Sequence, residues 1–195
     1  PFVPRHRVRE AVGVEYLVPL RREPRTLDLY FGSHYARGYG WLSPIDDQTA
    51  ILGYGTFDRA KFRHAPELLD RMFEFHRVKA RVEHVVLERN GGIFRTGMPL
   101  KQFHRKNLLL VGDTALQGNP VIGEGIRFVM DAARMAADAI VHVIQEDRCE
   151  LLSHYSTAWV KRYYHQYRVG YLANRVTSRL TAQDHLCDEI VNRLR

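Results

Sequence analysis

Residues 108–144 read LLLVGDTALQGNPVIGEGIRFVMDAARMAADAIVHVI, and this stretch decides the fold. Four apolar residues at 108–111 are bounded by turn residues, which predicts a short buried strand. Gly112 and Asp113 follow at its carboxyl end, and from Gly125 onward apolar residues recur at helical spacing. In open α/β sheets, ligands bind beyond the carboxyl ends of strands, and helix N-termini attract anions. The stretch therefore predicts a strand–loop–helix corner suited to a ligand.

Two interpretations of this corner fit its spacing. In the first, Asp113 accepts hydrogen bonds from a polyol or sugar, and Gly123 and Gly125 leave the backbone open to a flat ring or a phosphate. The unpaired N–H groups of the first helical turn then face a group that carries negative charge. In the second, Asp113 caps a turn and the glycines only permit tight packing. On spacing alone, both remain open.

Residues 111–126, VGDTALQGNPVIGEGI, resemble the second flavin-binding signature of the para-hydroxybenzoate hydroxylase-like flavoproteins. The resemblance implies that Asp113 binds the ribitol chain of FAD. It also implies that the backbone of the Gly123–Gly125–Ile126 turn faces the pyrimidine edge of the isoalloxazine ring. The cofactor-binding residues expected from it are Gly112, Asp113, Pro120, Gly123, Glu124, Gly125 and Ile126.

The sequence also departs from that family pattern. Thr114 and Leu116 stand where Ala and Gly are usual, so we expect different packing near the phosphates of FAD. The Rossmann motif G-x-G-x-x-G, which holds the FAD pyrophosphate, does not occur in the chain. We therefore expect the chain, which opens at Pro1, to be the carboxyl-terminal portion of a longer protein. In isolation it is expected to bind FAD weakly or not at all.

A second pattern lies at residues 39–55, where YGWLSP is followed after eight residues by GYG. Tyr39 and Trp41 are two residues apart, so on a strand they project from the same face. Two such rings can form the wall of an apolar pocket, and Gly53 and Gly55 on a neighbouring strand would leave room opposite them. Taken alone, an aromatic pair on a strand is more often part of an ordinary core.

The spacing of this second pattern resembles the YxWxFP…GxG motif of the geranylgeranyl reductase family, a branch of the same superfamily. The resemblance implies that the motif lines a cavity for a long isoprenoid chain near the flavin. Ser43 replaces the expected Phe, which opens space and adds a hydroxyl, a change that bears on the cavity shape and substrate preference. The substrate-binding residues expected from it are Tyr39, Trp41, Pro44, Gly53 and Gly55.

The rest of the chain predicts an α+β fold. Alternating apolar residues predict an antiparallel meander, in which the first two strands form a pair joined by a turn. A helix over 66–77 follows, then a strand at 82–89, a turn at Asn90-Gly91-Gly92 and a returning strand. The strands of the meander are expected at residues 13–20, 26–32, 38–44 and 48–55.

Helices dominate the final part of the sequence. After residue 125 the apolar stripe of the predicted helix consists of Ile126, Val129, Met130, Ala133, Ala137, Ile140, Val141 and Ile144. Farther on, aromatic residues recur at every fourth position from Tyr155 to Tyr171. They predict either a packed stripe or a helix lying in a membrane interface, with Tyr and Trp at headgroup level.

We accordingly divide the chain into three predicted segments. Residues 1–106 form an antiparallel β substrate-binding domain, and residues 107–148 form the strand–loop–helix segment of an FAD-binding domain. Residues 149–195 form a carboxyl-terminal helical region. The Rossmann half of the FAD domain is expected to be absent.

Composition narrows the function classes. The chain has 195 residues, a net charge of +7, ten His and only two Cys, Cys149 and Cys187. No apolar run approaches the ~20 residues that span a bilayer, and no metal-binding or nucleic-acid-binding motif occurs. The positive charge fits a solvated surface, anionic lipid headgroups or a phosphorylated substrate. We expect no nucleic-acid partner, no metal, and a cytoplasmic protein, peripheral at most at the inner face of the membrane.

These resemblances imply an FAD-dependent oxidoreductase when the protein is full length. It would reduce C=C bonds of a geranylgeranyl or related isoprenoid chain on a lipid or (bacterio)chlorophyll precursor, with electrons from NADPH or ferredoxin. The isolated segment is expected to be inactive, and no catalytic proton donor is assigned. The alternatives are a flavin-dependent aromatic hydroxylase or halogenase of the same superfamily, and a non-enzymatic remnant that binds a lipid or a partner.

Overall fold

The computed structural model of this protein describes residues 3–21, 26–35, 37–98, 100–121 and 123–180. Within them the chain forms two compact units. The first unit contains residues 3–10 and 94–175, and the second contains residues 11–93 and 176–180. Strands β1 and β5 and helix α4 each continue from one unit into the other.

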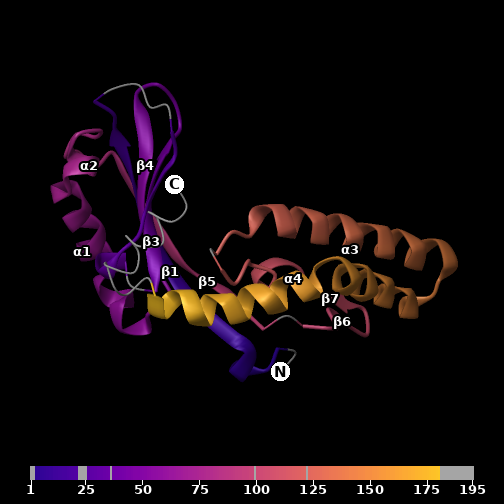
Figure 1. Ribbon diagram of the computed structural model, residues 1–195. Helices are drawn as coiled ribbons and strands as arrows, with labels where there is room; N and C mark the ends of the chain where they lie inside the picture. Colours follow the sequence, from indigo (N-terminus) through magenta and orange to yellow (C-terminus); the bar gives the residue numbers. More distant parts are fainter. Residues whose placement is uncertain (1–2, 22–25, 36, 99, 122, 181–195) are drawn as a thin grey trace. The chain divides into compact units, whose positions relative to one another are not determined.

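The elements of the described residues follow one another along the chain as Figure 1 shows. In order they are η1 (Arg5–Arg7), β1 (Val8–Pro19), β2 (Asp28–Tyr30), η2 (Ser33–Tyr35), β3 (Gly38–Pro44), β4 (Thr49–Thr56), η3 (Arg59–His64), α1 (Ala65–Asp70), η4 (Arg71–Glu74), α2 (His76–Lys79), β5 (Glu88–Gly97), β6 (His104–Arg105), β7 (Leu108–Leu109), η5 (Gly112–Ala115), α3 (Ile126–Glu146), η6 (Cys149–Leu152) and α4 (Ser153–Leu180).

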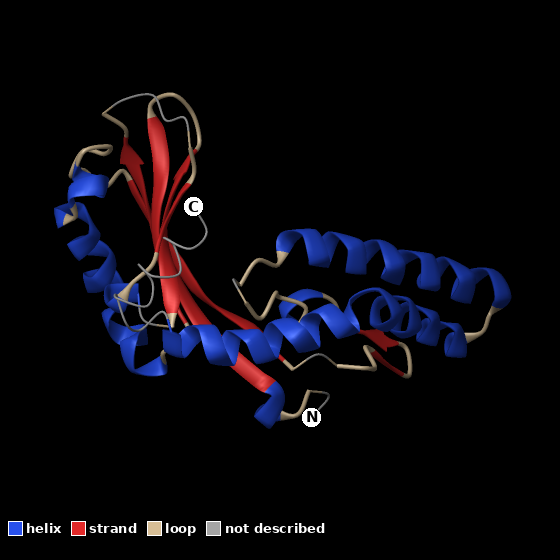
Figure 2. Cartoon of the chain, in the orientation of Figure 1, coloured by secondary structure: helices blue, strands red, loops and turns tan. Residues whose placement is uncertain are grey.

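The second unit is built on a sheet with the strand order β2-β3-β4-β1-β5, whose strands are red in Figure 2. The predicted strands of the meander are confirmed, but the predicted pairing of the first two is wrong. β1 pairs antiparallel with β4 from Val12↔Thr56 to Pro19↔Thr49, whereas β2 pairs with β3. The long β1–β4 ladder satisfies many more backbone groups than a three-residue strand can.

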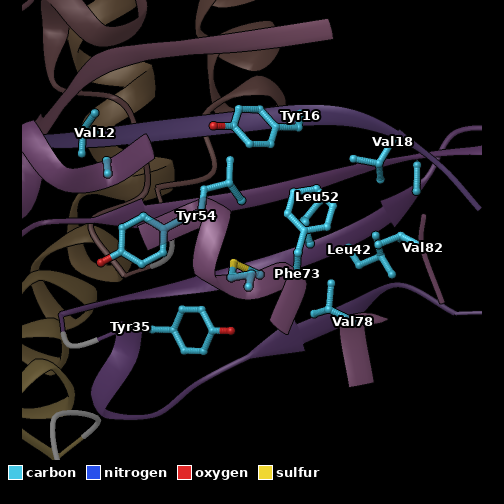
Figure 3. Close-up of a cluster of buried hydrophobic side chains, with 14 residues drawn as sticks. Val12, Tyr16, Val18, Tyr35, Leu42, Leu52, Tyr54, Phe73, Val78 and Val82 are labelled. Carbon is cyan, nitrogen blue, oxygen red and sulfur yellow. The ribbon is translucent and has the colours of Figure 1, made fainter. Parts of the chain in front are cut away.

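One face of this sheet carries the core of the second unit. Tyr16 and Val18 of β1 and Leu52 and Tyr54 of β4 alternate with side chains of the opposite face, as the strand period requires. In Figure 3 they meet Phe73 and other side chains of the helical segments that follow β4. The helix predicted over 66–77 is confirmed as three consecutive pieces, α1, η4 and α2.

The strand–turn–strand predicted over residues 82–96 is wrong. Val82 makes only an isolated bridge to Leu20, and β5 does not begin until Glu88. Gly91, which we predicted in a turn, lies inside β5. A Cβ atom on Gly91 would lie 3.0 Å from the carbonyl oxygen of Gly13, so the glycine permits a close backbone approach instead.

The first unit is built on α3 and α4, which lie side by side (Figure 1). Tyr155, Trp159, Tyr163 and Tyr167 of α4 are each at most 4% exposed. Phe128 of α3 places its ring 5.3 and 5.2 Å from the rings of Tyr163 and Tyr167, edge to face. The packed interpretation of the aromatic stripe is therefore confirmed for these four residues, and the interfacial interpretation is wrong for them, because buried rings cannot reach lipid headgroups.

The short buried strand predicted at residues 108–111 is also wrong in part. Only Leu108–Leu109 forms a strand, β7, which pairs antiparallel with His104–Arg105 in a two-stranded hairpin. Leu108 is 54% exposed, so this strand is not a buried member of a larger sheet in the described residues.

Helix α3 is confirmed, but the face that it buries is not the face that we predicted. Its buried side chains are Phe128, Ala132, Ala136 and Ala139. The predicted stripe is largely exposed, with Ile126 at 79% and Ile144 at 74%. Small alanines allow α3 to pack closely against η5, η6 and α4, and this leaves its larger aliphatic side chains facing outward.

The fold is α+β with an antiparallel sheet and helices, as predicted. The boundaries of the three predicted segments stay predictions, and residues 181–195 of the last one lie outside the described residues. Within the described part of the chain, no helix has both the length and the apolar character to cross a membrane. The same residues contain no group of His, Cys, Asp and Glu side chains able to hold a metal ion.

Candidate functional site

The predicted cofactor corner begins with a tight turn at η5. Gly112 has a φ of +73°, which favours glycine, and its amide N–H donates to the Oε1 atom of Gln117 at 2.7 Å. Leu116 ends the turn with a φ of +57°, in the left-handed region where the family pattern has Gly. Its side chain is 1% exposed in the core of the first unit. The burial of Leu116 thus compensates a backbone strain of about 1–2 kcal/mol.

Gln117 is the buried centre of a hydrogen-bond network that holds this corner. Its side chain is fully buried, and its Nε2 atom donates to the hydroxyl of Tyr155 at 2.7 Å. That hydroxyl donates in turn to the carbonyl of Leu110 at 3.0 Å. The Tyr167 hydroxyl donates to the backbone carbonyl of Gln117. Two tyrosines of α4 therefore fix the backbone on both sides of η5.

Burial shifts the acid–base behaviour of both tyrosines. It raises the pKa of Tyr155 to about 12. Burial is the main cause that raises the pKa of Tyr167, and the negative charge of Glu124 is the second. Both hydroxyls consequently stay protonated and act as hydrogen-bond donors throughout the physiological pH range.

Asp113, the residue predicted to bind ribitol, lies on the exposed side of η5. Its backbone carbonyl accepts from the amide of Leu116 at 3.1 Å, which fixes the turn. Within the described residues, its carboxylate makes no hydrogen bond or ion pair. The carboxylate is therefore available to accept hydrogen bonds from a ligand hydroxyl.

The loop before α3 folds back on itself and brings the rest of the predicted corner together. The amide of Asn119 donates to the carbonyl of Glu124 at 2.7 Å, and the amide of Gly123 donates to the carbonyl of Asn119 at 2.9 Å. Pro120, inside this loop, is buried. Glu124 also accepts from the amide of Arg127 at 3.2 Å through its Oε1 atom, so it caps the first turn of α3.

The two glycines of this loop differ in their surroundings, because the ring of Phe94 occupies the space at Gly123 and the space at Gly125 is open. Gly123 has a φ of +75°, and a Cβ atom there would lie 2.5 Å from the ring of Phe94. Gly125 precedes α3 directly, and a Cβ atom there would meet only the Cα of Gly118, at 3.9 Å. Ile126, the first residue of α3, is 79% exposed. The backbone around Gly125 is therefore open enough for a flat ring to approach, which fits the edge of an isoalloxazine.

The second predicted group lies on the sheet of the second unit. Tyr39 and Trp41 project from the same face of β3, with their ring centroids 5.5 Å apart, and Trp41 pairs with Gly53 of β4 and Tyr39 with Gly55. This is the face opposite the core, so the interpretation of the pair as ordinary core is wrong. Burial raises the pKa of Tyr39.

We predicted that the glycines leave empty space opposite the rings, but they do not. A Cβ atom on Gly53 would overlap the indole of Trp41, and one on Gly55 would lie 3.3 Å from it. The two glycines instead let the indole lie against the sheet. Gly13 of β1 pairs with Gly55 and lies next to it on the same face of the sheet. A Cβ atom on Gly13 would meet nothing within 4 Å. The open space on this face is therefore over Gly13.

The remaining two residues of the motif face opposite sides of the sheet. Pro44 follows the strand alternation of Leu42 and pairs with Ala50, so it lies on the core side, away from Trp41. Ser43, which replaces the family's Phe, pairs with Ile51 and shares the face of Trp41. The substitution at Ser43 therefore changes the aromatic face itself.

The structure brings each predicted group together within its own unit. Gly112, Asp113, Pro120 and residues 123–126 belong to the first unit, whereas Tyr39, Trp41, Gly53 and Gly55 belong to the second. The sequence did not single out Gln117, Tyr155 or Tyr167 as parts of the corner. A buried glutamine has no local sequence signal, although the four-residue spacing of the α4 aromatics placed both tyrosines on one stripe.

Comparisons with known proteins place these features in a family. No protein-family model matches the chain. The digeranylgeranylglycerophospholipid reductases of Methanococcus vannielii and Methanocaldococcus jannaschii are 32% and 29% identical to it, over 71% and 91% of its length. The chain belongs to the geranylgeranyl reductase family of FAD-dependent oxidoreductases. It spans only 35% and 44% of the length of these two geranylgeranyl reductase relatives.

Solved structures agree with the fold of the geranylgeranyl reductase family. A geranylgeranyl bacteriochlorophyll reductase-like protein from Thermoplasma acidophilum superposes with a TM-score of 0.78 at 21% identity, over 92% of this chain and 46% of its own. A probable FAD-dependent monooxygenase from Pseudomonas aeruginosa gives a TM-score of 0.60 at 14% identity, over 93% and 51%. At such identities the likeness shows the fold alone.

Proposed function

We propose that the protein to which this chain belongs is an FAD-dependent reductase of C=C bonds in a geranylgeranyl or related isoprenoid chain. The substrate would be carried on a lipid or a (bacterio)chlorophyll precursor. The observation that carries the proposal is the corner from Gly112 to Ile126, where the Asp113 carboxylate is exposed and makes no hydrogen bond or ion pair with the described residues, and where the backbone is open at Gly125. Membership in the geranylgeranyl reductase family supplies the chemistry that such a corner would serve.

The residues of the corner would divide the work of holding the cofactor. Asp113 would accept hydrogen bonds from the ribitol hydroxyls, and the backbone at Gly123, Gly125 and Ile126 would face the pyrimidine edge of the ring. The N-terminal end of α3 would stabilise negative charge on that edge. When bound, reduced FAD supplies a hydride equivalent to one carbon of a C=C bond, and a proton adds to the other.

The aromatic face of the second unit would hold the isoprenoid chain. The indole of Trp41 and the ring of Tyr39 offer flat apolar surfaces, and the glycine row beside them leaves space for an aliphatic chain above Gly13. Ser43 would make the cavity wider and more polar at its own position.

Further elements of the proposal concern the complete protein. NADPH or ferredoxin would supply the electrons, and contact with the surface of an anionic membrane would bring the protein to a lipid-bound substrate. The exposed apolar side chains of α3, such as Ile126 and Ile144, would be covered by other parts of the longer polypeptide.

The test uses the longer protein, reduced without oxygen and incubated with a geranylgeranyl lipid. We expect product whose mass increases by one hydrogen molecule per reduced bond. An Asp113→Ala variant should lose flavin during gel filtration, whereas Asp138→Ala, at an exposed carboxylate on α3, should retain it. Oxygen consumption coupled to substrate hydroxylation or halogenation, with no hydrogenated product, would contradict the proposal.

A further inference from the structure

A basic pocket lies in the first unit, and its lining shares no residue with the predicted cofactor corner. Its volume is about 520 Å³, within the range of ligand pockets. Strand β6 and the segment before it form one wall, and Tyr164 of α4 and the residues at and just before η1 contribute the others. The lining includes Arg7, Lys101, His104, Arg105 and Tyr164.

The charge of the lining has one sign. Arg7, Lys101 and Arg105 contribute positive charge, and none of the described residues that line the pocket is acidic. Within the described residues, these three side chains form no ion pair. In an ordinary solvated surface, basic side chains alternate with acidic ones, as Arg148 does with Glu146 and Glu150. Uncompensated cations gathered around one concavity attract an anion instead.

Contacts with α4 orient two polar side chains of the pocket, those of His104 and Lys101. Ser156 of α4 is 5% exposed; its hydroxyl accepts from the amide of Phe103 at 2.9 Å and lies 3.1 Å from Nδ1 of His104. When that hydroxyl donates to Nδ1, the proton of the neutral imidazole lies on Nε2, which then serves as a donor. On the same wall as His104, the ammonium of Lys101 lies 5.4 Å from the ring centre of Tyr164 of α4, which orients both side chains.

We propose that this pocket binds a phosphate group. A phosphate offers several acceptor oxygens and negative charge, which match guanidinium, ammonium and imidazole donors arranged around one concavity. Leu100 and Pro4 add apolar surface to the lining, which suits an organic phosphate better than a bare ion. The phosphate belongs either to a soluble phosphorylated compound or to a lipid headgroup. This inference rests on the pocket alone and does not depend on the flavin assignment.

The test compares two charge-matched variants of the 195-residue chain. Lys101→Gln/Arg105→Gln removes two cations from the pocket, and Arg63→Gln/Arg134→Gln removes two exposed cations outside it. Titration calorimetry with glycerol phosphate probes the soluble source. Flotation with vesicles of phosphatidylcholine, with and without phosphatidylglycerol, probes the lipid source.

We expect the pocket variant to bind at least about tenfold more weakly than the control, because two charge-assisted contacts are lost. Binding of glycerol phosphate identifies a soluble ligand, and binding only to vesicles that contain phosphatidylglycerol identifies a headgroup. Equal weakening in both variants, or no binding of either probe by the unaltered chain, overturns the proposal.

A second measurement does not depend on how the variants fold. In the unaltered chain, the successful probe should shift the ring resonances of His104 and leave those of His142 and His154 unchanged. Those two histidines lie near each other outside the pocket, with their ring centroids 6.5 Å apart. Shifts of equal size at all three histidines indicate unspecific attraction and overturn the proposal.

Discussion

The amide of Gly112 donates to the side-chain carbonyl of Gln117 at 2.7 Å, five residues along the chain. This contact closes the loop that carries Asp113 on its outer side. Because Gln117 also donates to Tyr155, the loop is tied to α4 as well as to itself. The position of the Asp113 carboxylate consequently depends on a buried side chain that need not touch any ligand.

Replacement of Gln117 by leucine should therefore destabilise the protein. The change keeps the volume similar but leaves the Gly112 amide without an acceptor and the Tyr155 hydroxyl without its donor. We expect the free energy of unfolding to fall by about 2–4 kcal/mol, measured from urea denaturation midpoints. Gln145→Leu, at an exposed position on α3, is the control and should change it by less than about 0.5 kcal/mol. Equal effects at both positions would refute the role of Gln117.

Two tyrosine-to-phenylalanine changes should have opposite consequences. Tyr155→Phe removes a hydroxyl that accepts from Gln117 and donates to Leu110, so we expect a loss of about 1–2 kcal/mol. Tyr35→Phe removes a buried hydroxyl that has no hydrogen-bond partner among the described residues, so stability should stay unchanged or rise. Denaturant unfolding of the two variants checks the difference, and a larger loss at Tyr35 would show that its hydroxyl has a partner.

The sequence predicted the elements of the sheet better than their partners. The periodicity of β1 to β4 depends on local alternation, which is visible in the chain. The choice of β4 rather than β2 as the neighbour of β1 depends on the lengths of the competing ladders. Gly91 illustrates the same limit, because the sequence alone does not distinguish a glycine required for close strand packing from one required for a turn.

The candidate site was predictable to a similar extent. The assignment of Asp113 and the glycines to a cofactor site stays a prediction of the motif, and the structure shows that Gly112 and Gly123 have positive φ values. The support from Gln117 was not predictable, because it depends on a helix that begins more than thirty residues later. Helix α3 has apolar side chains on two faces, and its pattern alone could not show which of them this chain buries.

Alkaline pH should destabilise the first unit through Tyr155. Burial raises the pKa of Tyr155 from 10.0 to about 12 in the folded state. Between these values the unfolded chain releases the proton while the folded protein keeps it, so the unfolded state binds fewer protons and stability falls as pH rises. The contribution of the protonated Tyr155 hydroxyl to the stability of the folded state is fully present below pH 10.0. Urea midpoints measured across this range should decrease, and the decrease should be smaller in Tyr155→Phe. A midpoint that does not change with pH would contradict the burial of this hydroxyl.

The contact between Trp41 and Gly53 makes the aromatic face sensitive to a single methyl group. A Cβ atom on Gly53 would overlap the indole, so Gly53→Ala should displace the Trp41 ring and cost about 1–3 kcal/mol. Gly13→Ala is the matched control on the same face, because a Cβ atom there meets nothing within 4 Å. It should be neutral or stabilise by about 0.5–1 kcal/mol.

The NMR signals of the two indole N–H groups separate these outcomes. The signal of Trp41 should move in Gly53→Ala and stay in place in Gly13→Ala, while that of the buried Trp159 in the other unit reports whether the protein remains folded. If the Trp41 signal keeps its position in Gly53→Ala, the ring does not lie on the glycine. The aromatic face would then lack the flat wall that we propose for the isoprenoid chain.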